Sequence, residues 1–134
     1  VIGMGASTNS CYGAQFGLPG SFSAIASYPL MAAAIESAKE NGVDYHVGNI
    51  LSSDTFYSDD AEASAKWRKL GVMAVEMEAA ALYMNAARAG KNALAILTIS
   101  DHLLTGEATT AEERQNSFTQ MMEVALETAV KMSR

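Results

Sequence analysis

Residues 71–83, GVMAVEMEAAALY, are the most informative part of this sequence. They lead a short apolar segment into a helical pattern, and they place Glu76 and Glu78 at the junction with Met77 between them. In an open α/β sheet, ligands bind at the carboxyl ends of the strands. The stretch therefore predicts a sheet flanked by helices, with a ligand site where this strand ends.

A second junction of the same kind follows at residues 97–102, LTISDH, where an apolar segment ends at Ser100 and Asp101. An ionised carboxylate accepts several hydrogen bonds and is suited to binding hydroxyl groups. Acidic residues at two strand ends therefore indicate a site for a small ligand that is rich in hydroxyls.

Hydrophobic periodicity and turn residues divide the chain into alternating strands and helices. The strands are expected at 1–6, 45–51, 73–75 and 93–99, and the helices at 30–39, 61–70, 78–88 and from Thr110 to about Met132. Gly42 and Gly90 mark two helix ends, and Thr110 with Glu113 forms a capping box for the last helix. This alternation predicts an α/β fold with a mixed, largely parallel sheet flanked by helices.

The composition excludes several classes of protein. A formal charge of −6 argues against a nucleic-acid-binding face, because counterion release from nucleic acid needs a basic surface. The single cysteine, Cys11, cannot form an intrachain disulfide and favours a reducing compartment. No apolar run reaches the length of a membrane span, and neither histidine has a partner at metal-ligand spacing. We therefore expect a cytoplasmic protein that binds no nucleic acid, membrane or metal.

A set of short motifs, in this order along nearly the whole chain, resembles the purine nucleoside phosphorylases of the bacterial hexameric type, within the nucleoside phosphorylase and nucleosidase superfamily. The motifs are VIGMGA at 1–6, VGN at 47–49, DTFYS at 54–58, VEMEAA at 75–80, SDH at 100–102 and TTAEERQ at 109–115. The stretch from Cys11 to Ser21 departs from the family pattern. The resemblance implies a nucleoside phosphorylase-like fold that is incomplete at the amino terminus, with residues 1–134 as the carboxy-terminal part of one domain.

The resemblance implies that Glu78 binds the sugar hydroxyls, with Glu76 and Met77 completing the substrate-binding segment. From the residues alone another reading stays open. Acidic residues in the first turn of a helix also suit the positive end of the helix dipole, without any ligand.

The resemblance assigns Asp101 as the acid that protonates the leaving purine, with Ser100 beside it in the substrate site, and implies that Arg114 approaches Asp101 when the site closes. A positioned acid of this kind contributes about 10²–10⁴-fold. Phe56 is assigned as the platform on which the base stacks. The residues alone also allow a turn-capping Asp101, a solvated Arg114, and core positions for Phe56 and Tyr57.

The activity that the resemblance implies is reversible phosphorolysis of purine ribonucleosides and deoxyribonucleosides, giving the free base and the pentose 1-phosphate. Inorganic phosphate is the co-substrate, no other cofactor is implied, and the phosphate-binding residues are expected outside this chain. The expected assembly is a homo-oligomer, a hexamer by resemblance. Two alternatives remain: a methylthioadenosine or adenosylhomocysteine nucleosidase, and a non-catalytic fragment that assembles with a complementary chain.

Overall fold

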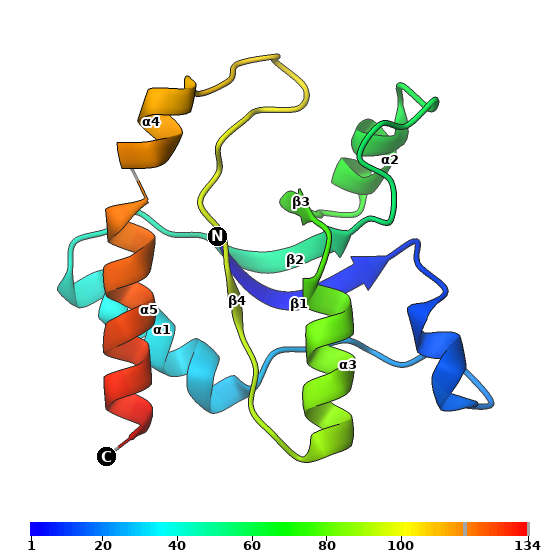
Figure 1. Ribbon diagram of the computed structural model, residues 1–134, viewed down its shortest axis with the longest axis horizontal. Helices are drawn as coiled ribbons and strands as arrows, with labels where there is room; N and C mark the ends of the chain where they lie inside the picture. The colour runs from blue at the N-terminus through cyan, green and yellow to red at the C-terminus, as the bar shows by residue number, and fades with distance from the viewer. Residues whose placement is uncertain (117, 134) are drawn as a thin grey trace.

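The computed structural model describes residues 1–116 and 118–133, and its centre is a four-stranded mixed sheet in the order β3-β2-β1-β4 (Figure 1). Three neighbouring strands run parallel, and the fourth pairs antiparallel with β1. The strands are β1 (Ile2–Thr8), β2 (Val47–Ser52), β3 (Ala74–Glu76) and β4 (Ala95–Ile96).

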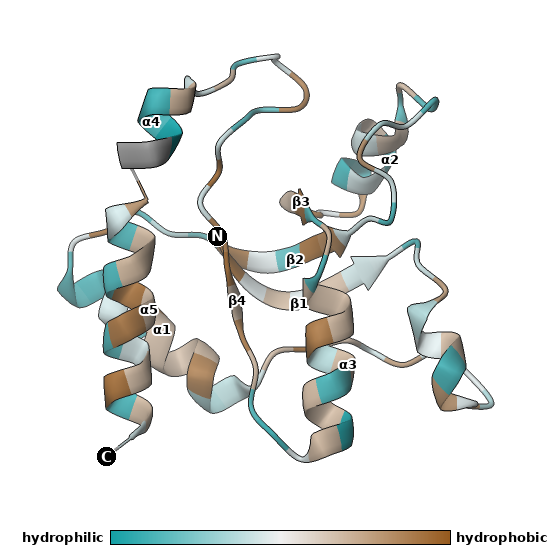
Figure 2. Cartoon of the chain, viewed as in Figure 1, coloured by the Kyte–Doolittle hydropathy of each residue, from teal (hydrophilic) through white to brown (hydrophobic). Residues whose placement is uncertain are grey.

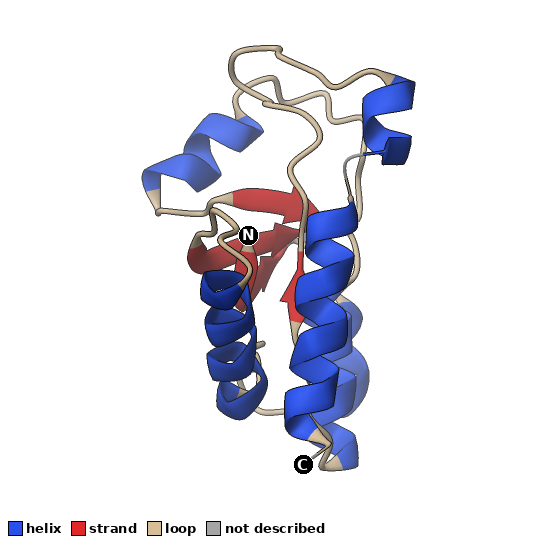
Figure 3. Cartoon of the chain, turned by 90° about the vertical axis from the view of Figure 1, so that its left-hand side faces the viewer, coloured by secondary structure: helices blue, strands red, loops and turns tan. Residues whose placement is uncertain are grey.

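Helices surround the sheet. They are the 3-10 helix η1 (Tyr12–Phe16) and the α-helices α1 (Tyr28–Glu40), α2 (Ala63–Lys69), α3 (Ala79–Ala89), α4 (Ala111–Asn116) and α5 (Thr119–Met132). Helix α1 packs against α5 and β1, and α3 packs against β1 and β2. Two perpendicular views place α2, α4 and segment 100–110 at one end of the molecule, with α1, α3 and α5 extending toward the other (Figure 1 and Figure 3).

Tyr83 of α3 lies at the centre of the core, where its side chain is only 1% exposed. Its hydroxyl donates a hydrogen bond to the carbonyl of Gly3 at 2.5 Å and accepts one from the amide of Ala95 at 3.0 Å. Burial raises the pKa of the Tyr83 hydroxyl, which therefore keeps the proton that it donates. One side chain of α3 thus joins β1 to β4.

The hydropathy of the elements follows this arrangement. Figure 2 shows that β4 is apolar, whereas α2 and α4 carry hydrophilic residues. Within the described residues, no helix has the length and apolar character needed to cross a membrane.

The predicted α/β fold with a mixed sheet and flanking helices is confirmed, and so are the local end signals. Gly42 and Gly90 both adopt the left-handed conformation, with φ of 62° at each, just after α1 and α3. The capping box also forms, since the amide of Thr110 donates to the Glu113 carboxylate at 2.7 Å and the amide of Glu113 donates to the Thr110 hydroxyl at 3.1 Å.

Two predicted elements were wrong. The expected strand 93–99 is reduced to Ala95–Ile96, because only these residues find ladder partners on β1, and Ile99 beyond them is 49% exposed. The expected single final helix is divided into α4 and α5. Helix α5 is held against α1 and buries Val124, whereas residues 111–114 of α4 are exposed and have no apolar face to continue that packing.

We predict that Tyr83→Phe destabilises the fold. The ring still fills its site, but the Gly3 carbonyl and the Ala95 amide lose their buried partner, at a cost of about 1–3 kcal/mol. The free energy of unfolding, measured by urea denaturation, checks this value. The matched control is Tyr12→Phe, because the hydroxyl of Tyr12 meets Asn85 in an exposed hydrogen bond that water replaces. Equal stabilities for the two variants would contradict the bridging role of Tyr83.

Candidate active site

The junction of β3 and α3 is built around the carboxylate of Glu76. One of its oxygens accepts a hydrogen bond from the hydroxyl of Ser52, at the end of β2. The other accepts from the backbone amides of Glu78 at 2.6 Å and Ala79 at 2.7 Å. The Glu76 side chain therefore caps the first turn of α3 and ties it to the neighbouring strand.

Glu78 is in a different position, although it lies only two residues further along. It is the N-cap residue of α3, but its side chain forms no capping hydrogen bond. It is exposed, and in the described part of the chain its carboxylate has no hydrogen-bond or ion-pair partner. Met77 beside it is also exposed. The two side chains are thus available to a ligand at this junction.

Asp101 is the centre of a second group of predicted site residues. Its carboxylate accepts a hydrogen bond from the hydroxyl of Ser100 at 2.6 Å, on one oxygen. The other oxygen lies 3.7 Å from a guanidinium nitrogen of Arg114, and both side chains are partly exposed. The structure therefore brings together Ser100, Asp101 and Arg114, from two segments that are 13 residues apart in the sequence.

A tight backbone hairpin supports this arrangement. Asp101 forms a bridge with Ala108, the amide of His102 donates to the carbonyl of Glu107 at 2.7 Å, and the amide of Thr109 donates to the carbonyl of Ser100 at 2.9 Å. The hairpin returns the chain toward its own start just before α4. This return places Arg114 beside Asp101.

The capping box at the start of α4 holds the same helix. The Glu113 carboxylate accepts a hydrogen bond from the backbone amide of Thr110, and this bond, together with the nearby Thr110 hydroxyl, lowers the pKa of the Glu113 carboxyl. Glu113 therefore stays ionised at the amino end of the helix, where negative charge is favourable. This fixes the first turn from which Arg114 extends.

Phe56 lies on the connection between β2 and α2, and its ring is 76% exposed. It meets Tyr57 edge to face, with ring centroids 4.9 Å apart. Tyr57 is 89% exposed, so neither ring fills the core of the described residues. An exposed aromatic face remains available for stacking.

The structure does not join all the predicted site residues into one contact network. No hydrogen bond or ion pair within the described ranges connects Glu78 with Asp101 or with Phe56. Ser52 is a functional candidate that the sequence did not reveal. Its only sequence signal is a polar residue that ends an apolar strand, and its partner Glu76 lies 24 residues away.

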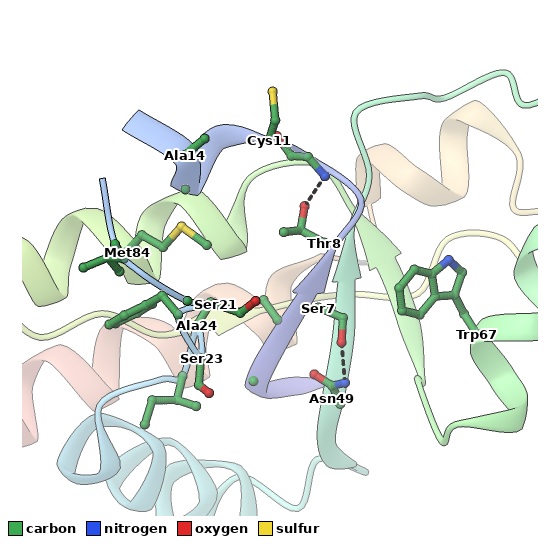
Figure 4. Close-up of a pocket in the computed structure, with 18 residues that line it drawn as sticks. Ser7, Thr8, Cys11, Ala14, Ser21, Ser23, Ala24, Asn49, Trp67 and Met84 are labelled. Carbon is green, nitrogen blue, oxygen red and sulfur yellow. Dashed lines mark hydrogen bonds between the residues drawn. The ribbon is translucent and has the colours of Figure 1, made fainter. Parts of the chain in front are cut away.

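A separate hollow of about 650 Å³ lies beside the second half of β1, next to η1 and segment 18–25 (Figure 4). Figure 4 shows Trp67 on one side of the two strands and Met84 on the other, and the side-chain amide of Asn49 on β2 donates a hydrogen bond to the Ser7 hydroxyl on β1 at 2.8 Å. None of the predicted site residues lines it. We place the candidate site at the junction of β3 and α3 and at the hairpin that begins at Ser100, because the predicted ionisable side chains lie there. In the same described residues, no group of His, Cys, Asp or Glu is arranged to hold a metal ion.

Comparison with known proteins agrees with the resemblance seen in the motifs. A family model described as "Phosphorylase superfamily" matches residues 5–133. The chain is 53% identical to the "Purine nucleoside phosphorylase DeoD-type" of Clostridium beijerinckii over 132 residues, which is 98% of this chain and 56% of that protein. It is 57% identical to the protein of the same name from Exiguobacterium sibiricum over 107 residues, which is 80% of this chain and 46% of that protein.

A third relative, "Purine nucleoside phosphorylase DeoD-type 2" of Vibrio cholerae, is 48% identical over 132 residues, again 98% of this chain and 56% of that protein. The chain thus spans about half the length of the curated relatives it matches. Since the family model covers nearly all of this chain, the chain belongs to the phosphorylase superfamily.

Proposed function

We propose that this chain takes part in the reversible phosphorolysis of purine ribonucleosides and deoxyribonucleosides. A phosphate oxygen attacks C1′ of the sugar, the bond from C1′ to N9 breaks with its electron pair on the purine, and the products are the free base and the pentose 1-phosphate. The observation that carries the proposal is the contact of Asp101 with both Ser100 and Arg114. The names of the relatives support the same reaction.

Asp101 acts as a general acid in this reaction. Negative charge develops on the purine as the glycosidic bond breaks, and a proton from Asp101 to N7 neutralises it. The resulting carboxylate is then stabilised by Arg114, which already lies 3.7 Å away. Because a cation also opposes protonation of a nearby acid, Arg114 contributes most if it approaches further as the proton leaves.

Glu78 and Phe56 bind the two parts of the nucleoside. The free carboxylate of Glu78 accepts hydrogen bonds from the vicinal hydroxyls of the ribose, and Met77 offers an apolar contact beside the sugar. The exposed ring of Phe56 stacks on the base.

Phosphate is bound by residues outside this chain. The net charge of −6 opposes the binding of an anion. The sequences of α4 and of segment 53–61, which carry Arg114 and Phe56, contain Arg114 as their single Lys or Arg residue. We therefore infer that the part of the relatives that this chain does not match supplies the phosphate site, and that the assembly is a cytoplasmic homo-oligomer that needs no other cofactor.

The nearest alternative is a nucleosidase acting on methylthioadenosine or adenosylhomocysteine, with water in place of phosphate. Arg114, within the run TTAEERQ at 109–115, favours the phosphorylase. The remaining alternative is a non-catalytic fragment that only assembles with a complementary chain.

The first prediction separates these alternatives. Residues 1–134 alone should not convert inosine, with phosphate or without it, because we propose that the phosphate site lies in the part of the relatives that this chain does not match. We define the completed protein as this chain fused behind the amino-terminal portion of the Clostridium beijerinckii relative. It should release hypoxanthine in a phosphate-dependent reaction, measured by chromatography. Release without phosphate would favour the nucleosidase, and no release would favour the non-catalytic fragment.

The second prediction concerns the sugar. In the completed protein, Glu78→Ala should lower kcat/KM for inosine on the order of 10- to 100-fold, because a charged hydrogen-bond partner contributes about 1.5–3 kcal/mol. The same change should have little effect on 2′,3′-dideoxyinosine, which lacks both hydroxyls. Equal losses on the two substrates, in steady-state assays, would mean that Glu78 serves the structure and not the sugar.

The third prediction concerns Asp101 and Arg114 together. In the completed protein, Asp101→Asn should lower kcat on inosine by about 10²-fold or more. Arg114→Ala should show a milder loss, and the double variant should be little worse than Asp101→Asn, because the arginine acts through that proton.

The control substrate for this pair is 7-methylguanosine, whose cationic base leaves without protonation. Its turnover should fall much less in all three variants, whereas a variant that is merely unstable loses both substrates together. Two results would contradict the proton-transfer role of both residues. One is a double variant whose loss of kcat equals the product of the two single losses, and the other is an equal loss of turnover on 7-methylguanosine and inosine.

A further inference from the structure

The carboxylate of Glu76 is already occupied by the protein itself. Three donors bind it: the Ser52 hydroxyl on one oxygen, and the backbone amides of Glu78 and Ala79 on the other. A carboxylate has about four acceptor sites. Little capacity remains for a substrate hydroxyl, although the residue was expected to contact the sugar.

Ser52 extends this connection. It is the last residue of β2 and is only 4% exposed. Its hydroxyl oxygen donates to Glu76 and also accepts from the backbone amide of Ala80 at 2.8 Å. The amides of residues 78, 79 and 80, which a helix amino terminus normally leaves without intrahelical partners, are therefore satisfied by Ser52 and Glu76.

This arrangement has a consequence for Glu78. The residue at the N-cap position of a helix usually uses its own side chain to accept one of these amides. Here Glu78 does not do so, because Glu76 has already taken that role. The carboxylate of Glu78 remains free at the exposed end of the helix.

We propose that Glu76 is a positioning residue, which together with Ser52 fixes the first turn of α3 and leaves Glu78 free to bind the sugar hydroxyls. This inference rests on the proposed function. It assigns Glu76 an indirect role in sugar recognition, through the backbone amides of Glu78 and Ala79. Ser52, which is buried, takes part in recognition without touching substrate.

The test compares the dependence on sugar hydroxyls, defined as the ratio of kcat/KM for inosine to that for 2′,3′-dideoxyinosine. In the completed protein, Glu76→Gln should lower this ratio on the order of 10-fold, because an uncharged amide cannot accept from all three donors. Ser52→Ala should also lower this ratio. Most of the loss should appear in KM for inosine, since the turn that presents Glu78 is no longer fixed.

Two comparisons separate positioning from direct contact. In a Glu78→Ala background, Glu76→Gln should change the ratio little further, because it acts through Glu78. The matched control is Ser53→Ala, which removes the neighbouring buried hydroxyl that bonds to Asn9 and Thr55 and not to α3. Ser53→Ala should keep the ratio.

Circular dichroism confirms that a variant is folded, and Ser52→Ala carries the test if Glu76→Gln does not fold. Two results would overturn the positioning role, provided that the unmodified enzyme turns over inosine. One is that Glu76→Gln lowers the ratio as much in the Glu78→Ala background as it does alone. The other is that Ser52→Ala leaves the ratio unchanged. Failure of the unmodified completed protein to use inosine would instead overturn the proposed function, and this inference with it.

Discussion

The buried hydroxyl of Tyr83 is the interaction on which the rest of this structure depends. It joins α3 to β1 and β4 through two hydrogen bonds, inside a core made largely of small side chains. Glu78 lies at the start of α3, and the segment after β4 leads to Asp101. The helix that presents Glu78 and the strand that precedes the Asp101 segment are therefore joined through one side chain.

Much of the fold could be predicted, because its signals are local. Helices α1, α2 and α3 begin and end within two residues of their predicted limits, and left-handed glycines end two of them. The capping box of α4 is encoded by two residues three positions apart. The length of β4 was overestimated because it depends on pairing with β1. The apolar pattern of residues 97–99 does not indicate whether a partner strand lies beside them.

The site was predictable only in part, for the same reason. Asp101 and Arg114 were identified through their motifs, but their contact depends on the hairpin between them, which periodicity does not predict. In the sequence, residues 76–78 form one acidic segment. In the structure, Glu76 accepts three hydrogen bonds from the protein, whereas the side chain of Glu78 is exposed and forms no capping bond. The difference arises from Ser52, which comes from another strand, so no reading of the segment alone could find it.

The contact between Tyr83 and Gly3 also constrains how this sequence can vary. A Cβ atom added at Gly3 would lie 2.8 Å from the Cδ1 atom of Ile50 and 3.1 Å from the Tyr83 hydroxyl oxygen, so the strand approaches the ring only because that position has no side chain. A side chain at position 3 therefore forces the end of the Ile50 side chain to move and the Tyr83 hydroxyl to give way. The residue tolerated at position 3 thus depends on the packing of Tyr83, 80 residues away in the chain.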